Sequence, residues 1–185
     1  MGHGALKLLR EGLGGIASHQ HFDPNVLPED RTIELPPASQ TNVSEKTGNI
    51  NKGEELSNKC WAPLGPFPSV LDLYDEGSVY VIDTPGHLPG HVNLLCRTGQ
   101  NKWILLGGDA CHDTRILSGE REIGTWKNDE GQTLCIHLDK AEAEKSIQRI
   151  RQLLEVNDNV EVIIAHDHLW YENAKNGGRM FPNTL

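Results

Sequence analysis

Hydrophobic and polar positions follow a regular pattern mainly in the second part of the chain, from about residue 70 onward. Short apolar runs bounded by glycine, proline or polar turn residues predict strands there. Four such runs are present, at residues 79–82, 91–97, 103–106 and 160–165. The segment 98–101 contains Gly99 and separates the second and third runs, so this pair is expected to form a hairpin.

A helical pattern is clearest at residues 140–155. Apolar side chains recur there at spacings of three and four, as one face of a helix requires. The stripe consists of Ala143, Ile147, Ile150 and Leu154. Asp139, with Glu142 three positions later, has the spacing of a capping box. The charges on the other positions indicate an outer, solvated helix. A second, shorter helix is predicted at residues 4–13.

Residues 25–69 show little periodicity and contain six of the ten prolines. This segment is expected to be an irregular insertion, either a long surface excursion or a flexible stretch. The chain has 185 residues, which favours a single domain over residues 1–185.

Charge and hydropathy exclude some classes of partner. The chain has 17 Lys and Arg against 26 Asp and Glu, a net charge of −9, which argues against nucleic acid as a partner. Mean hydropathy is −0.47, and no apolar run approaches the roughly 20 residues of a membrane helix. The four cysteines form no C-x-x-C pair, and the first 30 residues contain no apolar signal segment. We therefore expect a cytoplasmic protein without a membrane partner.

Nine histidines are the most informative chemical feature. Several lie with carboxylates where a predicted strand meets a loop, and side chains at one sheet edge converge from distant segments. In an extended segment, residues i and i+2 point the same way, so His19 and His21 are able to share one ion, and Asp23 continues that face. Imidazole and carboxylate ligands suit zinc, and also iron or manganese.

Four segments combine histidine or aspartate with turn residues: SerHisGlnHisPheAspPro (18–24), AspThrProGlyHisLeuProGlyHis (83–91), LeuLeuGlyGlyAspAla (105–110) and IleIleAlaHisAsp (163–167). In their order and spacing they resemble the metal-ligand motifs of the metallo-β-lactamase-fold superfamily, closest to its lactonase and glyoxalase-II-like hydrolases. The resemblance covers roughly residues 16–23 and 70–170. It implies an α/β fold, the αββα sandwich of that superfamily.

The resemblance also implies a site for one or two zinc ions, with iron or manganese as alternatives. The implied ligands are His19, His21 and His91 for the first ion, Asp23 and His166 for the second, and Asp109 as a bridge. Asp109 and Asp23 are then the catalytic carboxylates. A metal-bound hydroxide would attack the carbonyl of a small-molecule ester, lactone, thioester or β-lactam.

The remaining histidines are assigned other roles. His87 is the first histidine of its motif, and the resemblance implies that it is not a ligand but either supports the ligands or has a structural role. His112, like Cys111, is expected to pack near Asp109 without binding metal. His166 is preferred to His168 because it directly follows the apolar run. Two further histidines, His3 and His137, are expected to face solvent.

The sequence departs from the family pattern in two places. Pro24 stands where the motif H-x-H-x-D-H has its last histidine, as though four residues after Asp23 had been lost by deletion, splicing or a faulty gene model. Only 18 residues precede His19, so the N-terminal strand layer is expected to be largely missing. An exposed sheet would need cover, which predicts a homo-oligomer. The alternative function is therefore an impaired or inactive member that binds one metal or none and acts as a binding protein.

Overall fold

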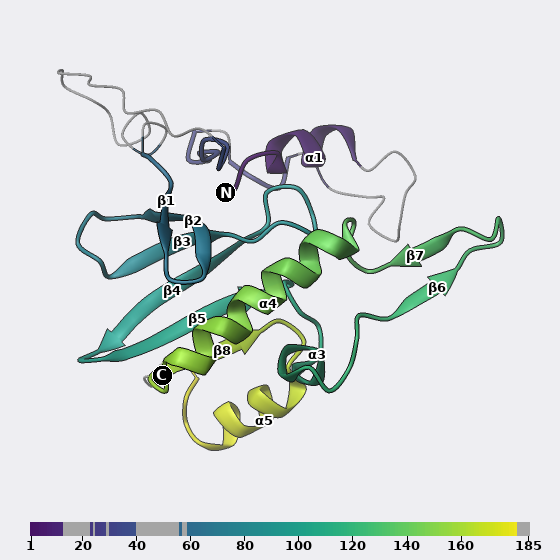
Figure 1. Cartoon of the computed structure of the whole chain (residues 1–185). Helices are drawn as coiled ribbons and strands as arrows, with labels where there is room; N and C mark the ends of the chain where they lie inside the picture. Colours follow the sequence, from purple (N-terminus) through teal and green to yellow (C-terminus); the bar gives the residue numbers. More distant parts are fainter. Residues whose placement is uncertain (13–22, 24, 29, 40–55, 57–58, 181–185) are drawn as a thin grey trace.

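The structure is a computed structural model that describes residues 1–12, 23, 25–28, 30–39, 56 and 59–180. Six strands form one sheet in the order β1-β2-β3-β4-β5-β8, and β6 and β7 form a separate ribbon that projects away from it (Figure 1). The strands are β1 (Ala62–Leu64), β2 (Phe67–Asp72), β3 (Val79–Asp83), β4 (Val92–Gly99), β5 (Lys102–Gly108), β6 (Thr125–Lys127), β7 (Thr133–Cys135) and β8 (Val160–Ile164). Neighbours in the large sheet are antiparallel except β5 and β8, which are parallel.

The helices with described bounds are α1 (Ala5–Glu11), α3 (Thr114–Ser118), α4 (Lys140–Val156) and α5 (His168–Asn176). The long helix α4 lies across one face of the sheet (Figure 1). In the described part of the chain, no helix combines the length and the apolar character needed to cross a bilayer.

The four predicted strands are present as β3, β4, β5 and β8. The predicted hairpin is confirmed, since β4 and β5 are antiparallel and Arg97 pairs with Trp103. Asn101 at the hairpin tip has a φ of 55°, a left-handed conformation that asparagine adopts more readily than most residues. Local pattern and turn chemistry therefore define this part of the sheet.

The segment predicted to be irregular contains two strands that the pattern did not reveal. β1 lies within it, and β2 begins within it at Phe67. Prolines interrupt the apolar pattern there, yet Pro68 is compatible with β2 because the pairing with β3 begins only at Val70. Phe67 and Leu71 are buried, so packing against the rest of the protein stabilises this strand.

Helix α4 confirms the prediction made for residues 140–155. The carboxylate of Asp139 accepts a hydrogen bond from the Glu142 amide at 3.0 Å and caps the helix. Its buried face contains Ala143, Ser146, Ile147, Ile150 and Leu153. Leu153 is buried at the end of this stripe, where the pattern predicted Leu154, which is only partly buried.

Both faces of the sheet carry apolar side chains, because alternate residues of a strand point to opposite faces. Ile82 and Leu105 belong to the cluster that packs with Ile150 of α4. Leu71 and Val81, which come directly before or after positions of the first cluster's strands, pack in a second cluster with Leu35 and Trp61. The predicted α/β class is confirmed. Among the described residues there is one large sheet, and a single domain spanning residues 1–185 remains a prediction.

Candidate metal centre

Asp109 and His166 meet because they follow two neighbouring parallel strands. Asp109 comes directly after β5, and His166 comes two residues after the end of β8. The carboxyl ends of parallel strands lie at the same sheet edge. The Nε2 atom of His166 is 3.2 Å from Oδ1 of Asp109. The strand order thus brings together two predicted ligands that are far apart in the sequence.

The backbone at His166 turns sharply to make this contact. His166 has a φ of 64°, in the left-handed region that non-glycine residues rarely adopt. The next residue, Asp167, caps α5 by accepting a hydrogen bond from the Trp170 amide at 2.8 Å. Strained backbone of this kind is concentrated at functional sites. The turn directs His166 to Asp109, while His168 becomes the first residue of α5.

His112 approaches the same carboxylate oxygen. Its Nε2 atom lies 3.2 Å from Oδ1 of Asp109, and its ring stacks on that of His166 with centroids 5.5 Å apart. Asp109, His112 and His166 each offer one ligand atom, and these atoms all lie within 4.8 Å of one another. The sequence predicted that His112 packs near Asp109. Only the structure shows that its ring nitrogen lies close to the carboxylate.

His91 lies on the other side of Asp109. Its Nε2 accepts a hydrogen bond from the Asp109 amide at 3.1 Å, and its Nδ1 lies 3.1 Å from the carbonyl oxygen of Thr84. The Thr84 carbonyl can only accept, so Nδ1 carries the proton and Nε2 holds the lone pair. Burial lowers the pKa of His91, although the hydrogen bond to Thr84 opposes this. His91 would bind a metal through Nε2 only if its hydrogen bond to Asp109 opened.

His137 is buried, contrary to the prediction that it faces solvent. Its exposed fraction is 3%, and its ring lies 5.3 Å from that of His87 and 5.1 Å from that of His112, between centroids. The loop after β7 folds onto the loop that contains His87, because the Leu138 amide donates to the His87 carbonyl at 2.9 Å. This contact between distant loops has no signature in the local sequence pattern.

Burial also changes the protonation of this histidine group. It lowers the pKa of His87 to about 4, and the nearby Asp109 partly opposes the effect while the neighbouring histidines reinforce it. The pKa of His137 is likewise lowered to about 4, first by burial and then by repulsion from His112 and His91. Both rings are therefore neutral at neutral pH, the form that binds metals.

The structure does not describe the three predicted ligands of the segment 19–23 as members of the group around Asp109. His19 and His21, like Pro24, lie outside the described residues. Asp23 is exposed, and its carboxylate accepts a hydrogen bond from the Asn25 amide at 2.8 Å. Among the described residues, neither group of three ligand atoms includes Asp23. Their roles as ligands stay predictions.

The residues present fit a divalent metal. Oδ1 of Asp109 is buried and, among the described residues, makes no hydrogen bond, although two imidazole nitrogens lie 3.2 Å away. A buried carboxylate oxygen without a hydrogen bond is costly unless a cation or a donor satisfies it. A carboxylate with imidazoles is a donor set that zinc favours. A metal between these groups would satisfy the oxygen.

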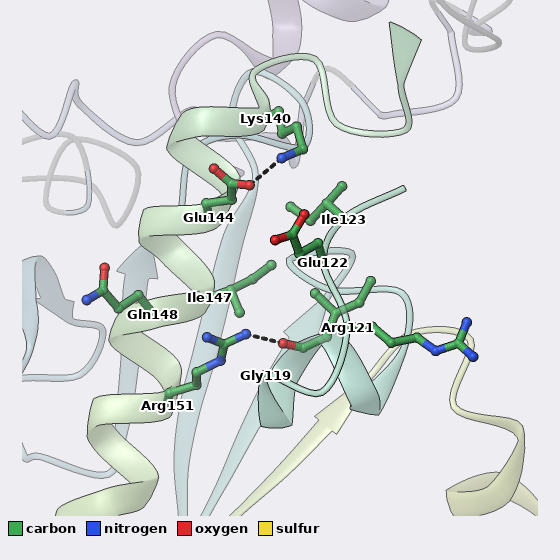
Figure 2. A pocket seen from close by; sticks show the side chains of 10 residues that line it. Gly119, Arg121, Glu122, Ile123, Lys140, Glu144, Ile147, Gln148 and Arg151 are labelled. Carbon is green, nitrogen blue, oxygen red and sulfur yellow. Dashed lines mark hydrogen bonds and ion pairs between the residues drawn. The ribbon is translucent and has the colours of Figure 1, made fainter. Parts of the chain in front are cut away.

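One of two pockets among the described residues lies beside a predicted metal ligand, and the other does not. One, of about 410 Å³, is lined by His91 together with Pro85, Leu88, Pro89 and Leu138. Another, of about 630 Å³, lies between α4 and the segment 119–123 that follows α3 (Figure 2). Among its charged side chains, Lys140 pairs with Glu144, and Arg151 donates to main-chain carbonyls that include Leu117 at 2.7 Å. Only the first pocket adjoins a predicted ligand.

No family model matches the chain. It is 26% identical to the cytochrome P450 monooxygenase mpaDE′ of Penicillium brevicompactum, over 82% of this chain and 22% of that protein. It is 37% identical to the metallo-hydrolase mfmC of Annulohypoxylon moriforme, over 55% of this chain and 32% of the relative. It is 28% identical to the N-acyl homoserine lactonase AttM of Rhizobium radiobacter, over 86% of this chain and 60% of the relative.

The chain therefore spans less than a quarter of the first of these relatives and less than two thirds of the others. Among solved structures, one of an N-acyl homoserine lactone hydrolase with the product N-hexanoyl-L-homoserine bound at its catalytic metal centre is similar, with a TM-score of 0.45 and 24% identity. That similarity covers 59% of this chain and 37% of the other.

Proposed function

We propose, on the premise that this chain is a relative of the metallo-β-lactamase-fold lactonases and metallo-hydrolases, that it acts in the metal-dependent hydrolysis of a small-molecule carbonyl compound. The bond is an ester, lactone or thioester, and zinc is the proposed metal, with iron or manganese as alternatives. The observation that carries the proposal is the convergence of His112 and His166 on one buried oxygen of Asp109.

Asp109 and His166 are the proposed ligands that the described residues bring together, and the approach of His112 makes it a third. When bound, a divalent ion lowers the pKa of a water molecule to about 7 and polarises the carbonyl. The protein's part is to hold the ligands in place. The hydrogen bonds of His91 fix the amide of Asp109 and leave its carboxylate directed at His112 and His166.

The remaining ligands of the proposed centre are His19, His21 and Asp23, and His91 becomes a ligand when its Nε2 releases the Asp109 amide. Thr84 supports His91, because its carbonyl accepts a hydrogen bond from Nδ1. This contact keeps the proton on Nδ1 and directs the lone pair of Nε2 towards Asp109. Asp109 and Asp23 are the proposed catalytic carboxylates. This assignment requires the segment around residue 23 to approach Asp109.

The pocket beside His91 is the proposed position of the substrate's apolar part. Pro85, Leu88, Pro89 and Leu138 supply an apolar wall, and Asp139 and Glu142 supply acidic groups. Apolar walls with a few polar groups are typical of small-molecule sites. The relative AttM is named an N-acyl homoserine lactonase, so an N-acyl homoserine lactone is a suitable first substrate to test.

A second candidate function has a specific observation in its favour. The lone pair of His91 Nε2 is used by the Asp109 amide, and Pro24 stands in place of a ligand. A protein with this arrangement binds fewer ions and acts as a ligand-binding protein without turnover. Metal content measured together with turnover separates the two functions.

The proposal is tested with Asp109→Asn, which keeps the size of the side chain and removes its charge. We expect zinc-loaded wild-type protein to hydrolyse N-hexanoyl homoserine lactone and to lose this activity on chelation. The variant should lose more than about 100-fold in kcat/KM, because even outer partners of metal ligands contribute 10–100-fold. The control is Asp129→Asn, in the exposed loop between β6 and β7. Wild-type turnover in the Asp109 variant would contradict the proposal.

A further inference from the structure

Three imidazole rings, those of His87, His112 and His137, gather beside the Asp109 centre. Their centroids are 5.1 Å apart for His87 and His112, 5.3 Å for His87 and His137, and 5.1 Å for His112 and His137. One ring nitrogen of each residue lies within 4.8 Å of the nitrogens of the other two. The three residues come from loops after β3, β5 and β7, so the fold assembles a group that no local motif encodes.

We propose that His87, His112 and His137 form a separate three-histidine site for a divalent transition metal of the zinc class. Imidazole nitrogens bind zinc at about 2.0–2.1 Å, which puts tetrahedral ligand atoms about 3.3 Å apart. Nitrogens that already lie within 4.8 Å of one another reach this spacing by small rotations of the rings. The absence of a carboxylate from this group distinguishes it from the group formed by Asp109, His112 and His166.

The polar atoms of His137 support this assignment. The residue is 3% exposed, and its Nδ1 has no hydrogen-bond partner among the described residues. Buried nitrogen atoms are nearly always hydrogen-bonded or bound to an ion. A metal between the three rings that is bound through Nδ1 of His137 would give this nitrogen a partner.

Main-chain contacts hold the loops in place. The amides of Leu138 and Asp139 donate to the carbonyls of His87 and Gly86, each at 2.9 Å. Asp139 then caps α4, so the loop that contains His137 is fixed at the start of a long helix. Ligands on fixed supports make a metal site selective, because binding then needs little rearrangement.

His112 lies between the two groups. Its Nε2 is 3.2 Å from Asp109 Oδ1, and its ring is in contact distance of both His87 and His137. His87 and His137 do not belong to the group formed by Asp109, His112 and His166. Substitutions of these two histidines therefore test the three-histidine site separately from the proposed hydrolase centre. The three-histidine site does not depend on the proposed function.

The experiment measures bound zinc by elemental analysis after saturation with Zn²⁺ alone and dialysis. The variants are His137→Gln and His87→Gln, and the matched control is His3→Gln, whose side chain is 56% exposed. We expect each of the first two variants to lose one equivalent of zinc per chain and His3→Gln to lose none. Zinc content equal to that of the control in both variants would overturn the proposal.

A further variant separates the two sites. Asp109→Asn should retain the zinc bound by the three histidines even if the proposed hydrolase centre loses its ion. If Asp109→Asn removes all bound zinc while His137→Gln removes none, the three-histidine site is refuted and the proposed centre stands. If His137→Gln removes all bound zinc while Asp109→Asn removes none, the proposed centre is refuted and the three-histidine site is supported.

Wild-type protein gives a test that does not depend on the folding of a variant. With ¹⁵N-labelled imidazoles, Zn²⁺ should shift the ring nitrogen resonances of His87, His112 and His137 together, with His3 unchanged. A His137 ring that keeps its metal-free resonances at saturating Zn²⁺ would overturn the proposal.

Discussion

At the scale of single residues, Gly86 lets the main chain before His87 pass close to helix α4. Its φ is 128°, and a Cβ atom there would lie 2.2 Å from the amide nitrogen of Ala143 and 2.4 Å from its Cα atom. Ser146 draws the same loop onto α4, because its hydroxyl donates to the Pro85 carbonyl at 2.8 Å. This close approach fixes the main chain directly before His87.

Gly86→Ala should therefore destabilise the protein by at least about 2 kcal/mol, since backbone strain and overpacking each cost about 1–3 kcal/mol. Urea unfolding monitored by circular dichroism measures the loss. Gly124→Ala is the control, because a Cβ atom there has no neighbour within 4 Å. Equal unfolding midpoints for the two variants would show that the loop moves away from α4 without cost.

At the scale of elements, α4 begins where the sequence predicts. Asp139 adopts an extended conformation, and its side chain accepts a hydrogen bond from the Glu142 amide, which otherwise has no partner within the helix. The same residue lies two positions after His137, so one cap fixes both the helix start and the histidine loop. The cap links local helix stability to the geometry of the loop.

Removal of this cap should have a modest cost. We expect Asp139→Ala to lower the free energy of unfolding by about 1 kcal/mol, within the range of 0.5–2 kcal/mol for capping residues. Asp139→Asn should retain most of the stability, because asparagine caps helices equally well. Thermal unfolding of the two variants makes the comparison. A loss of similar size in both would indicate that the charge of Asp139, and not its cap, stabilises α4.

At the scale of the whole molecule, burial of neutral histidines makes the metal-free fold sensitive to acid. The pKa values of His87 and His137 are lowered to about 4 in the folded protein, from 6.5. Between these values the unfolded chain binds more protons than the folded one, so stability falls as the pH decreases. His91, whose pKa burial also lowers, acts in the same direction.

We predict that metal-free protein is fully stabilised by these groups above about pH 6.5 and loses stability as the pH falls towards 4. Each of the two histidines contributes a slope of up to about 1.4 kcal/mol per pH unit in this window. Urea midpoints between pH 7.5 and 4.5 measure it. His137→Gln should reduce the slope. A midpoint independent of pH would show that the buried rings titrate as in the unfolded chain.

Several elements follow from local pattern alone. β3, β4, β5, β8 and α4 have recurrent apolar positions and clear turn or capping residues. β1 and β2 do not, because they are short and interspersed with proline. Packing of the buried Phe67 and Leu71 stabilises β2, whereas β1 is exposed and is held by its pairing with β2. For the candidate site, the resemblance implied that Asp109, His91 and His166 share a metal centre. The structure places both histidines beside Asp109, and their binding of a metal stays a prediction. The sequence placed His137 in solvent, and the roles of His19, His21 and Asp23 stay predictions.

By itself, the sequence determined which imidazole and carboxylate side chains are available, and it determined most of the strands and the long helix near them. Those properties depend on side-chain chemistry and on the repeat of apolar side chains, every two residues in a strand and every 3.6 in a helix. A short segment of sequence is long enough to show either repeat. Only the tertiary structure decided which imidazoles meet. The parallel pairing of β5 with β8 brings His166 to Asp109, and the contact between the His87 and His137 loops buries a ring that local pattern placed outside. Distances between remote residues depend on strand order and loop packing, and no local stretch of sequence specifies these.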